Sequence, residues 1–356
     1  MFHTFLFLKR HLRGLLLLMI LVSFPFKGNA ISFALDSIAT WGKFPRFVVN
    51  TYRWGDKFFN SYDSSYVVGT GTKFNVKLRT ETWTDHYSFG MEPNMRINMV
   101  SNATSTVGLH LTYLAVSVGY DLNITKIFTG TNLTRKRFMF GFNCALFAAD
   151  MFFYDNNTGT RITRFGPKGT HNDVDIPFYG VDNKEWGIDL YYFINNKKYS
   201  QAAAFNFSKI QKKSQGSWYF GLSYWNQSYN FNFNELPESM RDQLPLSWED
   251  YYYKVHTQVY SLKAGYGYNW ALGKHWIVCV SESPMIGFRK GNVNENNKNS
   301  IALNNILRVS AVYNLNRFFV GIVGRGYTSI VHEKESNLVS NMYSIEIAVG
   351  YRFNIW

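Results

Sequence analysis

Alternating apolar and polar positions mark the last strand-like stretch of this chain. From Tyr343 to Ile355 every second residue is apolar or aromatic, and the residues between them are small, polar or charged. Because successive side chains of a β-strand point to opposite faces, the stretch presents one apolar and one polar face. An apolar outward face with aromatic ends is typical of an outer-membrane barrel strand. The last strand of a soluble sandwich would show a similar pattern, so the rest of the chain has to decide.

The same alternation recurs along most of the chain. It is clear at 74–81, 107–113 and 260–270, and its phase shifts across Leu114-Ala115, as a hairpin requires if both strands show lipid the same face. We find about thirteen candidate strands, whereas a single-chain bacterial barrel has an even number. The sequence therefore predicts an all-β transmembrane outer-membrane barrel of about 12–14 antiparallel strands.

Two candidate strands are weak, and the connections between strands fall into two kinds. Residues 147–156 and 200–213 fit the membrane pattern poorly. Short connections expected to be periplasmic turns occur at 195–197, 272–274 and 314–316. Long polar stretches, which predict extracellular loops, occur at 156–184 and 233–253.

The beginning of the chain resembles a secretory signal peptide. Lys9, Arg10 and Arg13 precede an apolar run that is too short to span a bilayer comfortably, and small residues follow at 28–30. We therefore assign residues 1–30 to a signal peptide that exports the chain to the cell outer membrane.

Residues 31–70 form a separate N-terminal segment ahead of a barrel predicted over 71–356. Apolar residues at helical spacing between Phe44 and Phe59 predict an amphipathic helix. Such a helix could lie on the inner leaflet, fold into the lumen, or close the periplasmic mouth by ordinary packing.

The composition agrees with an exported barrel. Aromatic residues make up 18% of the chain, including 24 Tyr and 10 Trp, which suit a lipid–water boundary. After the signal there is no apolar run long enough for a membrane-spanning helix. The net charge of +13 would favour nucleic acid in a cytosolic protein. In an exported one it suggests outer-membrane lipid and lipopolysaccharide as partners, or a solvated surface, and no nucleic acid.

Two short motifs, at residues 62–67 and 203–217, resemble an uncharacterised family of Bacteroides-type outer-membrane proteins, the domain of unknown function four-four-two-one. Residues 62–67 are similar to the family's aromatic-Asp-Thr-Thr-Tyr segment, with Ser64 and Ser65 in place of two threonines. Residues 203–217 resemble its stretch from Ala-Ala-Phe to Gln-Lys-Lys-Ser and Gly-Ser, just after Tyr191-Tyr192 and the turn at 195–197. The resemblance implies an outer-membrane protein of Gram-negative bacteria and brings no known activity.

No familiar catalytic or nucleotide-binding motif occurs, and we expect no enzyme activity and no cofactor. His110 on a polar strand face and His86, expected in a loop, are the candidate bases if the protein does modify lipid. Cys144 and Cys279 allow at most one disulfide and are interpreted as small packing residues.

The informative chemistry is a set of ionisable residues on the inward strand faces. Such groups at membrane depth are tolerated when they are paired or wet, which indicates either a water-filled pore or a salt-bridged, filled lumen. The predicted lumen-lining residues are Lys77, Arg79, Glu81, His110, Asp121, Asp150, Asp189, Lys263, Arg308, Glu346 and Arg352.

Three functions fit this picture. The first is a passive channel or transporter for small polar solutes, and the second is a closed barrel that acts as a surface scaffold or adhesin through its loops. The third is a lipid-modifying enzyme. The last strand, which ends in aromatic residues, also predicts recognition by the barrel-insertion machinery.

Overall fold

The computed structural model describes most of the chain from Ser61 onward, together with Thr40, Arg46 and Asn50, which are helical. The described ranges are 61–91, 94–125, 134–157, 159–167, 169, 172–244, 251–293, 296–332 and 336–354. The predicted signal peptide lies outside them, as does nearly all of the predicted amphipathic helix. None of the helices in these ranges is long and apolar enough to cross a membrane.

Twelve antiparallel strands of the described chain close into a barrel, because the last strand, β17, pairs with the first barrel strand, β2. This confirms the predicted fold class and fixes the strand number. In the order in which they pair, the strands are β2 (Phe74–Met91), β4 (Thr104–Tyr113), β5 (Val116–Asn123), β6 (Thr134–Asn143), β7 (Phe147–Asn157), β10 (Val181–Phe193), β12 (Gln215–Asn232), β13 (Tyr252–Leu272), β14 (Trp276–Val293), β15 (Asn296–Leu315), β16 (Phe318–His332) and β17 (Ser336–Phe353).

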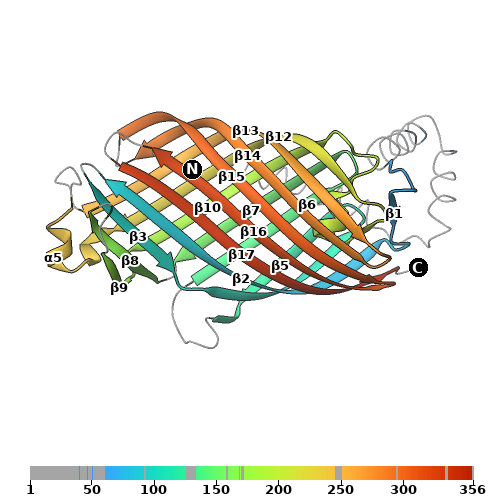
Figure 1. The fold of residues 1–356 in the computed structure, drawn as a ribbon, viewed down its shortest axis with the longest axis horizontal. Helices are drawn as coiled ribbons and strands as arrows, with labels where there is room; N and C mark the ends of the chain where they lie inside the picture. The colour runs from blue at the N-terminus through green and yellow to red at the C-terminus, as the bar shows by residue number, and fades with distance from the viewer. Residues whose placement is uncertain are drawn as a thin grey trace. The chain divides into compact units, whose positions relative to one another are not determined.

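The two ends of the barrel differ. One end carries the short turns after β4, β13 and β15 and is called the turn end below. At the other end β2 continues past its partner β4 and pairs instead with β3 (Met95–Ser101), which pairs with β8 (Thr160–Pro167) and β9 (Asp173–Phe178). We call β3, β8, β9, the short helix η2 (Phe233–Glu235) and α5 (Glu238–Arg241) the outer lobe (Figure 1). Short turns face the periplasm in outer-membrane barrels, so the outer lobe faces the outside.

The outer lobe corrects two sequence predictions. The stretch 156–184, predicted as an extracellular loop, lies at the outer end but contains the strands β8 and β9. His86 does not follow the first strand in a loop but lies within β2 and pairs with Val100 of β3. Both differences have one cause: β2 is 18 residues long and extends beyond the barrel, where it needs new partners for its backbone.

The exterior of the barrel is apolar, as a lipid-facing wall must be. Leu109, Leu262 and Ile301 are each more than 60% exposed, and they belong to a continuous set of exposed Leu, Ile, Val and Phe side chains. A closed sheet leaves no backbone edge unpaired in lipid. The protein is therefore an outer-membrane β-barrel, and the long alternating runs of its sequence are its membrane-facing strands.

Aromatic pairs ring the turn end of this exterior. In each pair the two residues are direct cross-strand partners near the strand ends, with ring centroids 4.7–5.3 Å apart. The pairs are Phe74–Tyr113, Phe147–Tyr192, Trp218–Tyr266, Trp276–Tyr313 and Phe318–Tyr351. Aromatic rings at this height form the girdle that outer-membrane barrels place at a membrane interface.

The connection between β10 and β12 turns back into the barrel instead of forming a plain hairpin. It starts at the predicted turn 195–197 and continues through a π-helix, η1 (Ala202–Asn206), and a short strand, β11 (Lys209–Gln211). We call residues 195–214 the plug. The prediction that 200–213 makes a poor membrane strand is explained, because this stretch lies inside the barrel.

Two apolar layers close the interior. At the turn end Ala203, Ala204 and Phe207 of the plug pack against Val312 and Phe319 of the wall. At the outer end a larger cluster from the wall strands and the outer lobe is packed around Phe89, Phe231 and Ile97. The polar interior of the barrel lies between these layers.

Candidate functional site: a charged chamber

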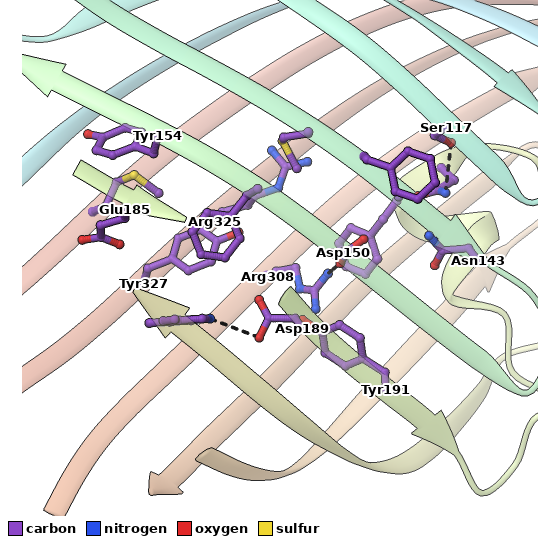
Figure 2. A pocket seen from close by; sticks show the side chains of 18 of the residues that line it. Ser117, Asn143, Asp150, Tyr154, Glu185, Asp189, Tyr191, Arg308, Arg325 and Tyr327 are labelled. Carbon is purple, nitrogen blue, oxygen red and sulfur yellow. Dashed lines mark hydrogen bonds and ion pairs between the residues drawn. The ribbon is translucent and has the colours of Figure 1, made fainter. Parts of the chain in front are cut away.

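A chamber of about 130 Å³ lies inside the barrel between the two apolar layers. Polar and charged side chains from several strands form its wall, and Gln201, Phe205 and Asn206 of the plug form part of its floor. Inward-facing residues of the strands supply the rest of the lining, because every second side chain of a barrel strand points to the lumen. Figure 2 shows a part of this lining.

One half of the chamber wall is an ion-pair network centred on Arg79. Its Nε donates to Asp121 Oδ1 at 3.0 Å, and its Nη1 donates to Glu346 Oε2 at 2.9 Å. Arg325 of β16 joins the network through Nη2, which donates to Glu346 Oε2 at 2.8 Å. His110 Nε2 lies 3.1 Å from Asp121 Oδ1. The carboxylates of Asp121 on β5 and Glu346 on β17 thus each contact basic side chains from two other strands.

A second network lies across the lumen on β7, β10, β13 and β15. Lys263 Nζ donates to Asp189 Oδ1 at 2.6 Å, and Ser223 donates to the same oxygen. Asp189 is the direct cross-strand partner of Asp150. Arg308 Nη1 donates to Asp150 Oδ2 at 3.4 Å, a long contact (Figure 2).

The structure brings most of the predicted lumen residues together in these two networks. Ten of these eleven residues are buried, and the side chain of the eleventh, Asp150, is 26% exposed. Lys77 joins the first network through Glu346 Oε1 at 3.4 Å, and Glu81 pairs with Arg325 at 3.3 Å. Six of the eleven line the chamber itself: Lys77, Arg79, His110, Asp150, Asp189 and Arg308. Glu81, Asp121, Lys263 and Glu346 are buried partners in the networks, and Arg352 contacts the plug.

Sequence reasoning missed three charged residues of the chamber, Arg325, Glu185 and Asp85. The inward face of β16 reads Phe319, Gly321, Val323 and then Arg325, since its first part packs on the plug. Because the inward residues in this part of β16 are apolar or small, like the outward ones, the usual alternation of polar and apolar residues is not visible in the sequence. Glu185 precedes the clear alternating part of β10.

Several polar atoms that line the chamber have no hydrogen-bond partner among the described residues. They include Nε and Nη2 of Arg308, the side-chain carbonyl oxygens of Asn183 and Gln227, and Oγ of Ser329. Buried polar groups cost free energy unless they are paired, so these atoms call for water or a polar ligand. The described residues include no group of three His, Cys, Asp or Glu placed to hold a metal ion.

The two candidate bases do not form one site. His110 faces the lumen, whereas the ring of His86 lies 5.4 Å from that of Tyr343, a half-exposed residue of the outer surface. Cys144 and Cys279 are both free and buried. Cys144 lies in the turn between β6 and β7 and not in a strand, and burial raises the pKa of its thiol.

Comparison with known families agrees with the resemblance seen in the sequence. The profile of a domain of unknown function, DUF4421, matches residues 61–353. The chain belongs to this family. In this DUF4421 protein the two stretches that carry the resemblance meet, because β1 (Val67–Gly69) pairs with β11 of the plug. No curated protein sequence matches the chain.

Solved structures similar to this DUF4421 protein include outer-membrane proteins and an autotransporter domain. The outer membrane protease OmpT from Escherichia coli is 7% identical over 80% of this chain and 98% of its own, with a TM-score of 0.38. The translocator domain of the autotransporter NalP from Neisseria meningitidis is 11% identical over 90% and 99%, with a TM-score of 0.35. The outer membrane protein OprG from Pseudomonas aeruginosa is 11% identical over 81% and 100%, with a TM-score of 0.26.

Proposed function

We propose that this protein is a gated outer-membrane channel for small polar solutes and that the chamber is part of the solute pathway. The observation that carries the proposal is the lining of the chamber by charged side chains and by polar atoms without protein partners. A barrel that served only as an anchor would gain more stability from an apolar filling, because buried ion pairs contribute little net free energy.

The plug is the proposed gate. Its apolar residues pack against the wall at the turn end, and its polar groups are held by a small number of side chains. Asn269 donates to Ser200 O at 2.9 Å, and Gln211 donates to Lys198 O at 2.6 Å. A solute that leaves the chamber toward the periplasm has to displace this segment.

Single-channel conductance of the protein in a planar bilayer tests the proposal. Ile194 N donates to Trp218 O at 3.0 Å, so β10 and β12 are already close enough for a tight hairpin. We would therefore compare the full protein with a variant in which residues 196–216 are replaced by a two-residue Asn-Gly turn. Brief openings of the full protein and steady current through the variant support a gated channel. A correctly folded variant that carries no current and passes no solute overturns it.

A surface-contact role is a second candidate, and the outer lobe favours it. β8 and β9 stand beyond the barrel and carry exposed ion pairs, Arg161–Asp175 and Arg164–Asp173. Removal of residues 160–178 would abolish binding to a cell or protein partner while the barrel still folds. Unchanged binding after this deletion would reject the role.

We also propose that the barrel-insertion machinery recognises β17. The support is its outward face, on which Tyr343, Ile345, Ile347 and Val349 are about half exposed. Substitution of Ile347 by Asp is expected to reduce insertion into outer-membrane vesicles that contain the machinery more than insertion into pure lipid. An equal loss in both would count against specific recognition.

A further inference from the structure

The charges of the chamber are separated along the barrel axis. Arg308 lies beside Asp150 and Asp189, and Glu185 lies apart from them (Figure 2). Because β10 runs from the outer end to the turn end, Glu185 is nearer to the outer lobe than Asp189 is. Glu185 and Asp189 share one face of β10 and are four residues apart, which corresponds to about 13 Å along a strand. The chamber therefore offers a cationic group and an anionic group at different depths.

Arg308 has donors to spare. Its side chain is only 8% exposed, and its single ion pair in the described chain is the long contact with Asp150. The aromatic rings of Tyr191 and Phe205 lie 4.9 and 5.4 Å from its guanidinium carbon and hold it in place. Its Nε and Nη2 have no partner in the described chain. Two adjacent N–H donors of a guanidinium match the two oxygens of a carboxylate.

Glu185 is an acidic residue without a basic partner. The hydroxyl of Tyr229 and the side-chain amides of Asn183 and Gln227 donate to its carboxylate. No described Lys, Arg or His forms an ion pair with it. The free carbonyl oxygens of Asn183 and Gln227 lie on the same chamber wall. An ammonium group would find an anion and several neutral acceptors here.

We propose that the chamber binds a small zwitterionic peptide of two or three residues, with its carboxylate on Arg308 and its ammonium group near Glu185. The two networks of the chamber wall are internally paired, so a neutral ligand with separated charges matches the site better than a simple ion does. Consecutive Cα atoms are about 3.8 Å apart, so such a peptide, together with the reach of the two side chains, spans the separation of the charges. Amide N–H groups of the peptide would donate to Asn183 and Gln227. This inference rests on the proposed function in taking the chamber as the solute site.

Isothermal titration calorimetry on the full protein in detergent tests the inference with three probes. Ala-Ala carries both charges, N-acetyl-Ala-Ala lacks the ammonium group, and Ala-Ala-amide lacks the carboxylate. Arg308→Met should weaken Ala-Ala binding by a factor of ten or more and leave the already weak binding of the amide unchanged. Glu185→Gln should weaken Ala-Ala and leave N-acetyl-Ala-Ala unchanged. Arg317→Met and Glu238→Gln, which remove exposed charges, should change none of these affinities.

Further measurements distinguish a loss of peptide binding from misfolding of the variant and from failure of the proposed channel function. Arg308→Lys keeps the charge but loses the fork of donors, so intermediate affinity in a folded variant supports the assignment. Equal binding of all three probes, or none at millimolar concentration, overturns the inference. Binding without solute flux would refute the channel and keep the site, whereas flux without binding would refute the site and keep the channel.

Discussion

Arg352 of the last strand holds the backbone of Phe207, the residue that follows the π-helix of the plug. Its Nε and Nη2 donate to the carbonyl oxygen of Phe207 at 2.9 and 2.8 Å, and Nη2 also donates to Asn314 Oδ1 at 2.5 Å. Phe207 has a positive φ of 59°, so its carbonyl has left the helical direction and needs a partner. One side chain thus ties β17 to a segment 145 residues earlier in the sequence.

Loss of this contact should loosen the plug. Arg352→Met leaves the carbonyl of Phe207 unpaired in a buried position, at a cost of about 1–3 kcal/mol. We expect longer and more frequent channel openings in planar bilayers than for the unchanged protein. Arg317→Met is the matched control, since this exposed arginine contacts Tyr351 and not the plug. Identical gating of Arg352→Met and the unchanged protein would show that the contact does not hold the gate.

A glycine in β16 makes the room that Phe207 occupies. A Cβ on Gly321 would lie 2.6 Å from Cζ of Phe207, which is too close for any real contact. Gly321→Ala should therefore displace the plug and increase conductance. Gly326→Ala on the same strand is the control, because the nearest atom to its Cβ would be in the ring of Tyr343, at an ordinary contact distance of 3.5 Å. If both variants conducted alike, the position of Phe207 would not control the pore.

The wall of the barrel was predictable from the sequence, because alternation alone decides which side chains of a strand face lipid and which face the lumen. Lys77, Arg79 and Glu346 could be placed on the inward face in this way. Which of these residues pair with one another could not be predicted, because the contacts of Lys77 and Arg79 with Glu346 depend on the closure of β17 on β2, which local pattern does not encode.

The plug and the outer lobe were not predictable for a different reason. Residues 200–213 show no clear period, since a short π-helix and a three-residue strand are too brief to establish one. In 156–184 the polar composition suggested a loop, although β8 and β9 have strand partners. Polar strands outside the membrane lose the apolar stripe on which the prediction depends.

We expect loss of either charge of the Lys263–Asp189 ion pair to destabilise the protein more than loss of both charges together. The side chain of Lys263 is fully buried and Nζ lies 2.6 Å from Asp189 Oδ1, so Lys263→Met leaves a buried carboxylate without its cation. Removal of one partner of such a pair costs about 3–5 kcal/mol. Urea unfolding from lipid vesicles should show this loss for Lys263→Met.

Two further variants serve as controls for the loss of stability in Lys263→Met. Lys184→Met removes an exposed partner of Asp182, 3.6 Å away, and should change the free energy of unfolding by less than about 1 kcal/mol. The double variant Lys263→Met with Asp189→Leu removes both charges and should regain much of the lost stability. No recovery in the double variant would indicate that Asp189 is needed for its contacts with Ser223 and Trp225.

Cys279 provides a chemical report on the plug. Its side chain is buried in β14 and belongs to the same apolar cluster as Ala203, Ala204 and Phe207. In a Cys144→Ser background, a water-soluble maleimide should label Cys279 slowly while the plug is in place. Labelling should become at least about ten times faster in the Arg352→Met variant, because movement of the plug opens a path from the turn end to the thiol. Conductance that rises in this variant without faster labelling would show that ions pass by another route and that the plug has not moved.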